Sequence, residues 1–332
     1  MNKSYFLLLF ILVVQIYSCK KSTTTTGNSS QPTGPNVYVA GSGTYWKNDS
    51  VVYLTGATLV SGIYVSGNDV YVAGVVTGGN GAESAYGPSN KGAYWKNDSL
   101  VTVSDGSTHV QVNSIFVSGN DVYLAGFVVS GDGLTSFAEY WKNGIPVILS
   151  DSSSAGGANS VFVSGNDVYV AGAVDNFNIA AYWKNGHLVT LSDSSGTAVA
   201  NSIFVSGTDV YIAGFMNNTA VYWKNGNPVV LSDSSRNASA TSIFVSGTDV
   251  YVAGFESNGT HNVAKYWKNG VSVNLSDGSQ DAYVTSIYVF GNDVYVAGSD
   301  EPYGSPSIQY WKNGNLVTLS RGAGIPSSIF VK

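Results

Sequence analysis

One short phrase built around Tyr-Trp-Lys occurs seven times along this chain of 332 residues. Its fullest copy is AYWKNGHLVTLSD, which runs from Ala181 to Asp193. Successive tryptophans are separated by 49, 46, 42, 40, 44 and 44 residues, and they are Trp46, Trp95, Trp141, Trp183, Trp223, Trp267 and Trp311. Repeats of this length are typical of arrays in which every unit contributes four β-strands. The chain is therefore expected to fold as one array rather than as unrelated domains.

Each repeat divides into four short pieces rich in Val, Ile, Tyr, Phe and Trp, which favour β-strands. Piece a is SIFV, as at Ser202–Val205, and piece b is DVYVAG, as at Asp249–Gly254. Piece c carries Tyr-Trp-Lys, and piece d follows the pattern xVxL and ends near Ser-Asp. Ser-Gly-Asn-Asp or Ser-Gly-Thr-Asp joins a to b, and Asn-Gly usually joins c to d. Asn-Gly favours a two-residue hairpin because both positions take a positive φ.

The order of the four pieces within a sheet follows from their polarity. Pieces a and b are nearly continuous apolar runs, which is typical of strands buried on both faces. Piece d alternates and twice contains proline, at Pro146 and Pro228. Proline cannot donate to a strand ladder, so piece d is predicted to be the outer edge strand.

The two ends of the repeat region complement each other. The region opens with a piece b, Asn36–Gly41, that has no piece a before it, and it ends with a piece a, Ser328–Lys332, that has no piece b after it. Each piece occurs seven times only if both ends share one sheet, which is how propellers close. The sequence therefore predicts an all-β, seven-bladed β-propeller over residues 36–332, with four antiparallel strands per blade. We expect a monomer.

The chain resembles the broad group of exported bacterial propeller repeats, and its VYVAG pieces are similar to the YVTN-type units of that group. The resemblance spans Asn36–Val331. It implies the fold and not an activity, because propellers carry many unrelated functions.

The N-terminus has the features of an export signal. Asn2 and Lys3 precede an apolar run that is too short to span a bilayer comfortably. The stretch Ile-Tyr-Ser-Cys resembles the lipobox of bacterial lipoproteins, although Tyr17 is bulkier than that pattern prefers, and Cys19 is the only cysteine of the chain. Residues 1–18 are predicted to be a lipoprotein signal peptide and Cys19 the site of lipid attachment. Residues 19–35 are rich in Ser, Thr, Gly and Pro and are predicted to be a flexible tether. The resulting localisation is the bacterial cell envelope, anchored to a membrane.

Length variation is confined to one class of connection. From the Gly that ends piece b to the Tyr that opens piece c, the step is 4, 20, 14, 10, 8, 12 and 12 residues, whereas the a–b and c–d turns keep their length. Alternating strands place the b–c and d–a connections on one face of the propeller, called here the loop face, and the a–b and c–d turns on the opposite turn face. Binding residues concentrate on loops held by a rigid scaffold. The longest connection is Val75–Ala93.

Candidate ligand-binding residues lie in these b–c connections. They include every glutamate of the chain, and the full set is Glu83, Tyr86, Glu139, Glu256, His261, Glu301 and Tyr303. The lysines of Tyr-Trp-Lys and the aspartates that begin piece b, such as Lys184 and Asp167, are expected to form a solvated rim. The tryptophans are expected to fill the gaps between blades, the alternative being a sugar-stacking site at each one.

Several functions are excluded or unsupported. The net charge of −6 and pI of about 4.9 leave no basic stripe for nucleic acid. Nucleotide-binding and α/β-hydrolase motifs are missing, and no cofactor is expected. His187 lies on the turn face, away from His261 and His109, so we expect no metal site. Sialidase activity is excluded because sialidases use three arginines and this chain has two, Arg236 and Arg321. Its SDGS and SDSSG stretches also lack the aromatic residue of the sialidase Asp-box.

Three functions remain from the sequence. The leading hypothesis is a lipid-anchored envelope protein that binds a protein or a glycan through the loop face without catalysis. The second is an enzyme acting on polysaccharide, with two loop glutamates as acid and base, since paired carboxylates suffice for glycoside hydrolysis. The third is a multivalent lectin with repeated sites between blades. Close glutamates would favour the enzyme, and exposed tryptophans the lectin.

Overall fold

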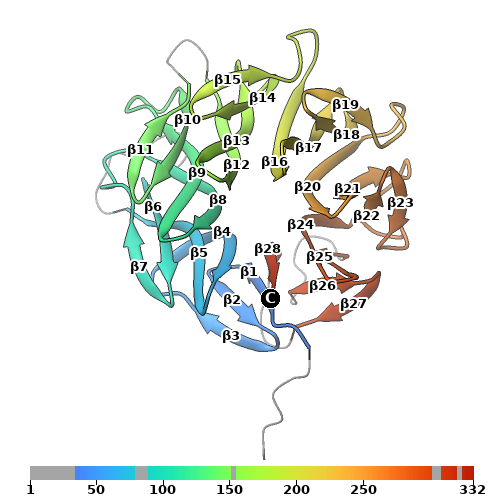
Figure 1. Cartoon of the computed structure of the whole chain (residues 1–332), viewed down its shortest axis with the longest axis horizontal. Helices are drawn as coiled ribbons and strands as arrows, with labels where there is room; N and C mark the ends of the chain where they lie inside the picture. Colours follow the sequence, from blue (N-terminus) through green and yellow to red (C-terminus); the bar gives the residue numbers. More distant parts are fainter. Residues whose placement is uncertain (1–33, 79–88, 151–154, 301–307, 320–323) are drawn as a thin grey trace, which may run out of the picture. The chain divides into compact units, whose positions relative to one another are not determined.

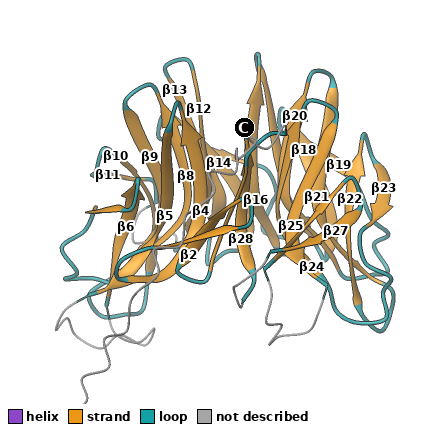
Figure 2. Cartoon of the chain, turned by 90° about the horizontal axis from the view of Figure 1, so that it is seen from below, coloured by secondary structure: helices purple, strands orange, loops and turns teal. Residues whose placement is uncertain are grey.

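The computed structural model describes residues 34–78, 89–150, 155–300, 308–319 and 324–332. In this part of the chain, 28 strands pair into seven antiparallel sheets of four strands each (Figure 1). The described residues form no helix, and hence none that could cross a membrane (Figure 2). Pro35–Lys332 makes up one compact unit. Cys19, the predicted signal peptide and all of the predicted tether except its last two residues lie outside the described residues.

The strands fall into four classes that correspond to the four sequence pieces. The inner a-strands are β28 (Pro326–Val331), β4 (Ala57–Ser66), β8 (Val110–Ser118), β12 (Gly157–Ser164), β16 (Ala198–Ser206), β20 (Ala238–Ser246) and β24 (Tyr283–Phe290). The b-strands are β1 (Val37–Gly41), β5 (Asp69–Thr77), β9 (Asp121–Val129), β13 (Asp167–Val174), β17 (Asp209–Met216), β21 (Asp249–Ser257) and β25 (Asp293–Ser299). The c-strands are β2 (Thr44–Lys47), β6 (Asn90–Lys96), β10 (Ser136–Lys142), β14 (Ile179–Lys184), β18 (Thr219–Lys224), β22 (Asn262–Lys268) and β26 (Gln309–Lys312). The outer d-strands are β3 (Ser50–Tyr53), β7 (Ser99–Thr102), β11 (Ile145–Ile148), β15 (His187–Thr190), β19 (Asn227–Val230), β23 (Val271–Asn274) and β27 (Asn315–Thr318).

The seven sheets are the blades of a β-propeller, as predicted. Blade 1 has the order β28-β1-β2-β3, so both ends of the repeat region share it, and blades 2 to 7 follow in chain order from β4–β7 to β24–β27. Val39 of β1 pairs with Ile329 of β28, and Val37 pairs with Val331. Each inner strand contacts the next one around the ring, including β28 with β4 (Figure 1). The predicted seven-bladed fold, closed within one blade, is confirmed.

The turns have the conformations that their residues favour. In the c–d turn of blade 4, Asn185 and Gly186 have φ values of 51° and 81°, as a two-residue hairpin with a type I′ turn requires. In the a–b turn of blade 5, Gly207 alone has a positive φ, of 59°. The Gly that ends piece b has a different role: a Cβ on Gly214 would lie 2.0 Å from the carbonyl oxygen of Val199. Only glycine therefore permits the close approach of the two inner strands.

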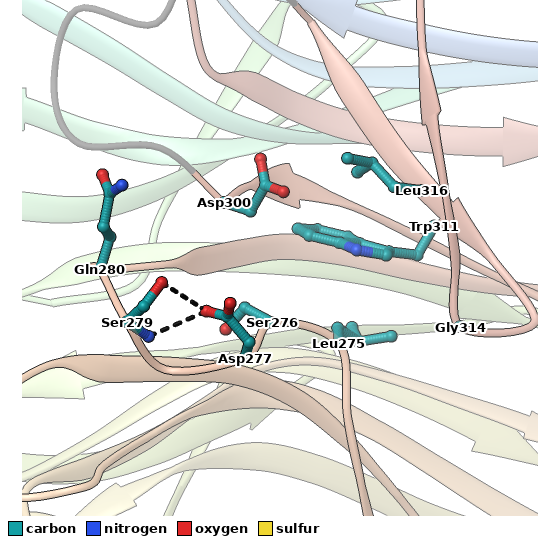
Figure 3. A pocket seen from close by; sticks show the side chains of 9 residues that line it. All are labelled: Leu275, Ser276, Asp277, Ser279, Gln280, Asp300, Trp311, Gly314 and Leu316. Atoms are coloured by element: carbon teal, nitrogen blue, oxygen red, sulfur yellow. Dashed lines mark hydrogen bonds between the residues drawn. The ribbon is translucent and has the colours of Figure 1, made fainter.

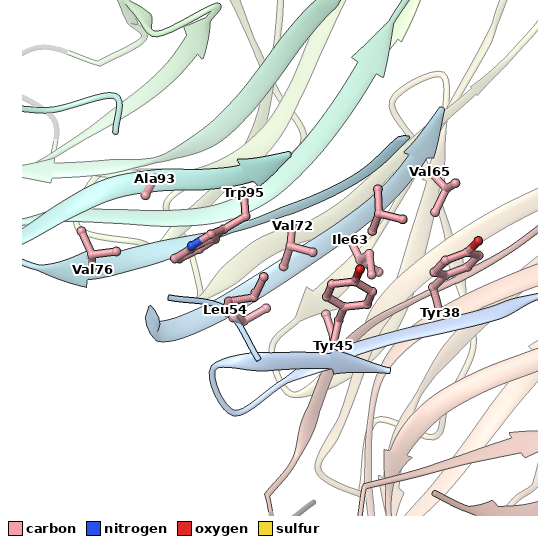
Figure 4. Close-up of a cluster of buried hydrophobic side chains, with 12 residues drawn as sticks. Tyr38, Tyr45, Leu54, Ile63, Val65, Val72, Val76, Ala93 and Trp95 are labelled. Carbon is pink, nitrogen blue, oxygen red and sulfur yellow. The ribbon is translucent and has the colours of Figure 1, made fainter. Parts of the chain in front are cut away.

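Apolar side chains from adjacent blades form the core. Between blades 1 and 2, Tyr38, Tyr45 and Leu54 pack against Ile63 and Trp95 (Figure 4). Equivalent clusters join the remaining neighbours, and all seven tryptophans are buried, with 0–2% of their surface exposed. The prediction that tryptophans fill the gaps between blades is confirmed. Pro146 and Pro228 lie in the outer strands β11 and β19, as predicted.

Polar side chains link the inner strands of neighbouring blades. A bulge in β12 leaves Asn159 unpaired within its sheet, and its amide donates to the carbonyl of Ala200 in blade 5 at 3.0 Å. The next residue, Ser160, accepts the backbone N–H of Ile203 at 3.3 Å. The same serine contact recurs at four other blade boundaries, where the acceptors are Ser114, Ser202, Ser242 and Ser286. Pairing resumes on the N-terminal side of each bulge, so the inner strands are longer than piece a alone.

Candidate functional site

The loop face is built differently from the sequence expectation. The repeat pattern predicts that Glu139 and Glu256 lie in b–c loops, and this is wrong: they lie in strands β10 and β21. Likewise Val75–Ala93 is not one long loop, because Val75 pairs with Gly92 and Thr77 with Asn90. The b- and c-strands continue past their repeated pieces as hairpins, since the residues that follow VYVAG still pair with the residues before Tyr-Trp-Lys. The remaining candidates Glu83, Tyr86, Glu301 and Tyr303 lie outside the described residues.

Glu139 is a buried carboxyl group in β10, the c-strand of blade 3. It is 7% exposed, and it has no hydrogen-bond or ion-pair partner among the residues that the structure describes. Burial raises the pKa of Glu139 to about 7, because the charged form loses its hydration. The same register position holds Ala181 in blade 4 and Gln309 in blade 7. Glu139 is thus an ionisable replacement at a packing position.

Glu256 is held by an ion pair within blade 6. Its Oε2 lies 2.5 Å from Nζ of Lys265, and both side chains are largely buried. Lys265 also lies over the ring of Trp267, 5.9 Å from the ring centre. The second carboxylate oxygen accepts the backbone N–H of Asp233, in the adjoining d–a connection of blade 5, at 3.4 Å. Glu256 therefore has a structural role, and its oxygens are already occupied.

His261 belongs to a local network that ties the b–c connection of blade 6 to the following d–a connection. Its Nδ1 lies 3.9 Å from Oδ1 of Asp281, which also accepts the backbone N–H of Asn262 at 2.7 Å. The amide of Asn258 donates to the carbonyl of Gly278 at 2.9 Å. These contacts fix the d–a connection from one side and leave its other side facing blade 7.

A cavity of about 410 Å³ lies between that d–a connection and blade 7 (Figure 3). It is lined by Leu275, Ser276, Asp277, Ser279, Gln280, Asp300, Trp311, Gly314 and Leu316. Asp277 accepts the side-chain and backbone donors of Ser279, at 2.7 and 2.9 Å, and these bonds hold the pKa of Asp277 below its usual value. Oδ1 of Asp300 is buried without a hydrogen-bond partner in the described part of the chain. Oxygen acceptors therefore dominate the polar lining, together with the amide of Gln280.

The repeat pattern does not predict this cavity. The SDGSQ stretch that forms one wall has only a superficial likeness to an Asp-box in sequence. The Ser-Asp-x-Ser turn recurs with the same backbone contact around Asp105, Asp193 and Asp233, so the motif by itself marks a turn. What distinguishes blade 6 is Gln280 after the turn and Asp300 opposite it. That juxtaposition spans two blades and cannot be seen in one repeat.

The turn face carries a repeated rim of ion pairs. In blade 4, Nζ of Lys184 lies 2.9 Å from Asp167, the amide of Asn185 donates to the same carboxylate at 2.8 Å, and the lysine lies over Tyr169. Five other blades repeat the Lys–Asp pair. Blade 1 has Asn36 at the aspartate position. Each of these lysines is about half exposed, in agreement with the predicted solvated rim.

The burial of the tryptophans contradicts the lectin hypothesis, and the described residues bring no two of the candidate glutamates together. A lectin with a tryptophan platform between blades requires exposed tryptophan, and the burial of all seven contradicts it. The predicted glycosidase requires two of its loop glutamates close together, as acid and base. Glu139 belongs to blade 3 and Glu256 to blade 6, so two blades separate the only candidate glutamates that the structure places. No group of three or more His, Cys, Asp or Glu residues able to hold a metal ion occurs within the described ranges.

Comparisons with known proteins show no family for this chain. No protein-family model matches the sequence. No curated protein is significantly similar to it. Solved structures with a similar fold include a chain of a nidogen–laminin complex, with 10% identity, a TM-score of 0.47 and coverage of 90% of this chain and 98% of that one. YjhT has 12% identity and a TM-score of 0.47, covering 80% and 99%. The β-propeller domain of the trilobed protease from Pyrococcus furiosus has 9% identity and a TM-score of 0.49, covering 82% and 85%.

Proposed function

We propose that this chain is a non-catalytic binding protein of the bacterial cell envelope, exported and lipid-anchored through Cys19, that recognises a glycan or a protein through its loop face. The observation that supports this proposal most directly is the cavity between blades 6 and 7, whose polar side chains come from loop-face connections, although Gly314 of a c–d turn also lines it. Its carboxylate, hydroxyl and amide groups line a hollow between rigid sheets, and such convergent polar groups are typical of ligand sites.

The lining of this cavity favours a glycan over an apolar ligand. Asp277 and Asp300 present acceptor oxygens, and sugar hydroxyl groups are donors that match them. Gln280 can both donate to and accept from the same ligand. The lowered pKa of Asp277 keeps its carboxylate charged and accepting near neutral pH. Trp311 is buried beneath the cavity, so it closes the floor and does not offer a stacking face.

The test combines a glycan array with capture of envelope proteins by the full-length chain. Asp277→Asn together with Asp300→Asn should lower binding of the recognised ligand by about tenfold or more, because two charged acceptors are lost. Asp193→Asn is the matched control: it alters the same Ser-Asp-x-Ser turn in blade 4, outside the cavity. Equal losses in both variants would place the ligand elsewhere. If replacing Lys184, Lys224 and Lys268 with Ala abolishes ligand binding, the ligand binds the turn face instead.

A further inference from the structure

The third residue of piece a is aromatic in every blade, and these residues form a closed ring inside the propeller. They are Tyr64, Phe116, Phe162, Phe204, Phe244, Tyr288 and Phe330. Each ring contacts its two neighbours, with centroids 4.7–5.1 Å apart all the way round, including Phe330 with Tyr64. All seven are only half-buried, so their inner edges remain accessible.

The spacing and tilt of the rings define how they point. Seven centroids at these separations lie on a circle with a radius of about 5.6 Å, and adjacent planes make angles of 46–56°. A sevenfold arrangement with every plane containing the central axis would give about 51° between neighbours. Rings placed side by side with their faces toward the axis would overlap at this spacing. The ring planes therefore run along the central axis, with their edges rather than their faces toward the centre.

This arrangement leaves a narrow apolar bore. With centroids about 5.6 Å from the axis, the innermost ring carbons lie about 4.2 Å from it, within the range of van der Waals contact for a carbon atom on the axis. A single file of methylene groups would thus contact the five phenylalanine rings at once, which leaves the hydroxyl groups of the two tyrosines for its head group. The edge atoms of a flat aromatic ligand centred on the axis would come within about 3 Å of the innermost ring carbons, which is closer than van der Waals contact allows. The bore selects an unbranched chain.

The cavity that contains this bore is apolar, as the binding of an alkyl chain requires. The cavity has a volume of about 310 Å³ and is lined by the seven aromatic residues with Ile63 and Ile329, none of which carries a charge. The only polar atoms on these side chains are the hydroxyl groups of Tyr64 and Tyr288, on either side of Phe330, and neither has a hydrogen-bond partner among the described residues. Burial raises the pKa of Tyr288 to about 12, and that of Tyr64 in the same direction, so both hydroxyl groups remain donors at neutral pH.

We propose that the aromatic ring binds the unbranched alkyl chain of an amphiphile, whose hydroxyl or carboxyl head group hydrogen-bonds to Tyr64 or Tyr288. This site is separate from the cavity between blades 6 and 7, and it stands whether or not that cavity binds a glycan. Burial of each methylene group contributes to binding through the hydrophobic effect, so affinity rises with chain length until the cavity is filled.

The test is isothermal titration calorimetry of the full chain with n-octanol, n-hexanol and benzyl alcohol. We expect one n-octanol site per chain, with weaker binding of n-hexanol and at least tenfold weaker binding of benzyl alcohol. Phe204→Trp fills the bore and should lower n-octanol affinity at least tenfold, whereas Tyr53→Ser, on an outer strand with 74% exposure, should not change it. The melting temperature of each variant verifies folding.

A second variant keeps the proposal testable if Phe204→Trp does not fold. Tyr64→Phe with Tyr288→Phe preserves the ring and removes both hydroxyl groups, so n-octanol should bind several-fold more weakly. Absence of n-octanol binding up to its solubility limit would overturn the site. So would benzyl alcohol binding as tightly as n-octanol, because the ring would then only pack the interior. Unchanged n-octanol affinity in the tyrosine variant would overturn the assigned head-group contact.

Discussion

The backbones of Asn36 and Lys332 exchange two hydrogen bonds: the N–H of Asn36 donates to the carbonyl of Lys332 at 2.6 Å, and the N–H of Lys332 donates to the carbonyl of Asn36 at 2.9 Å. The last residue of the chain is therefore fastened to the first residue of the repeat region. These two hydrogen bonds join the ends of β28 and β1 in blade 1, whereas in the other six blades a covalent a–b turn joins the corresponding strands.

Deletion of Ser328–Lys332 should destabilise the propeller severely. The deletion removes Ile329 and Val331, which are 3% and 1% exposed, and each such side chain is worth about 1.5–3 kcal/mol when buried. Against a typical free energy of unfolding of about 5–15 kcal/mol, the loss should lower the melting temperature by about 10 °C or more. Circular dichroism melts of the truncated chain and of Lys332→Ala provide the measurement and its control. A truncated chain that melts within a few degrees of the parent would contradict this closure.

Glu139→Gln should stabilise the protein in a pH-dependent way. The folded pKa of about 7 lies above the ordinary value of 4.5, so the wild-type stability associated with the neutral carboxyl is full below about pH 4.5 and is lost as the pH rises through 7. The variant should match wild type near pH 4 and exceed it by about 3 kcal/mol at pH 8. Urea unfolding at several pH values measures this difference. Gln309 occupies the same position in blade 7, so glutamine fits this environment. A difference that does not vary with pH would refute the raised pKa.

The ion pair between Glu256 and Lys265 should be replaceable only as a pair. Glu256→Met or Lys265→Val alone leaves an unpaired charge in a largely buried site and should cost about 3 kcal/mol of unfolding free energy. The double variant reproduces Met216 and Val221, which hold the same positions in blade 5, and should return to within about 1 kcal/mol of wild type. Chemical denaturation of all four proteins checks the cycle. Additive losses in the double variant would show that the two charges are not coupled.

Replacement of residues 79–88 by Asn-Gly should leave the propeller folded. The N–H of Gly78 donates to the carbonyl of Ser89 at 2.7 Å, so these residues already stand opposite each other at a distance that a two-residue hairpin can close. The replacement removes Glu83 and Tyr86. If the ligand of the loop face contacts them, its affinity should fall while the melting temperature stays within a few degrees. A loss of folding would mean that these ten residues support the blade.

Cys19→Ala should release the protein from membranes. Cys19 follows the Ile-Tyr-Ser stretch that resembles a lipobox, and a lipid chain cannot be attached to alanine. Fractionation of expressing bacteria, with immunoblotting of the soluble and membrane fractions, measures the change. Retention of the variant in the membrane fraction would refute anchoring by lipid, and Ser18→Ala is a control that keeps the cysteine.

Several features of the fold could be predicted from the sequence because they depend on short-range chemistry. The two-residue turn at Asn185 and Gly186 follows from the φ values these residues tolerate, and the edge position of Pro146 follows from its missing N–H. The unmatched pieces at Asn36 and Lys332 predicted closure, since each strand class had to be complete. Glu139 and Glu256 were misplaced because strand pairing extended beyond the repeated pieces, and no pattern in a single repeat marks where pairing stops.

The sequence by itself determined the seven blades, through the number of repeats and the complementary pieces at the two ends. It also determined the strand order and the burial of the tryptophans, because these depend on a pattern contained within one repeat. Only the tertiary structure decided which side chains meet across blades. Asp277 and Asp300 belong to different repeats and share a cavity because blades 6 and 7 pack side by side. Tyr64 and Phe330 are at opposite ends of the repeat region, and they contact each other because the ring closes. The physical reason is that local propensities fix the conformation of each unit, whereas the juxtaposition of units depends on the packing of the closed ring.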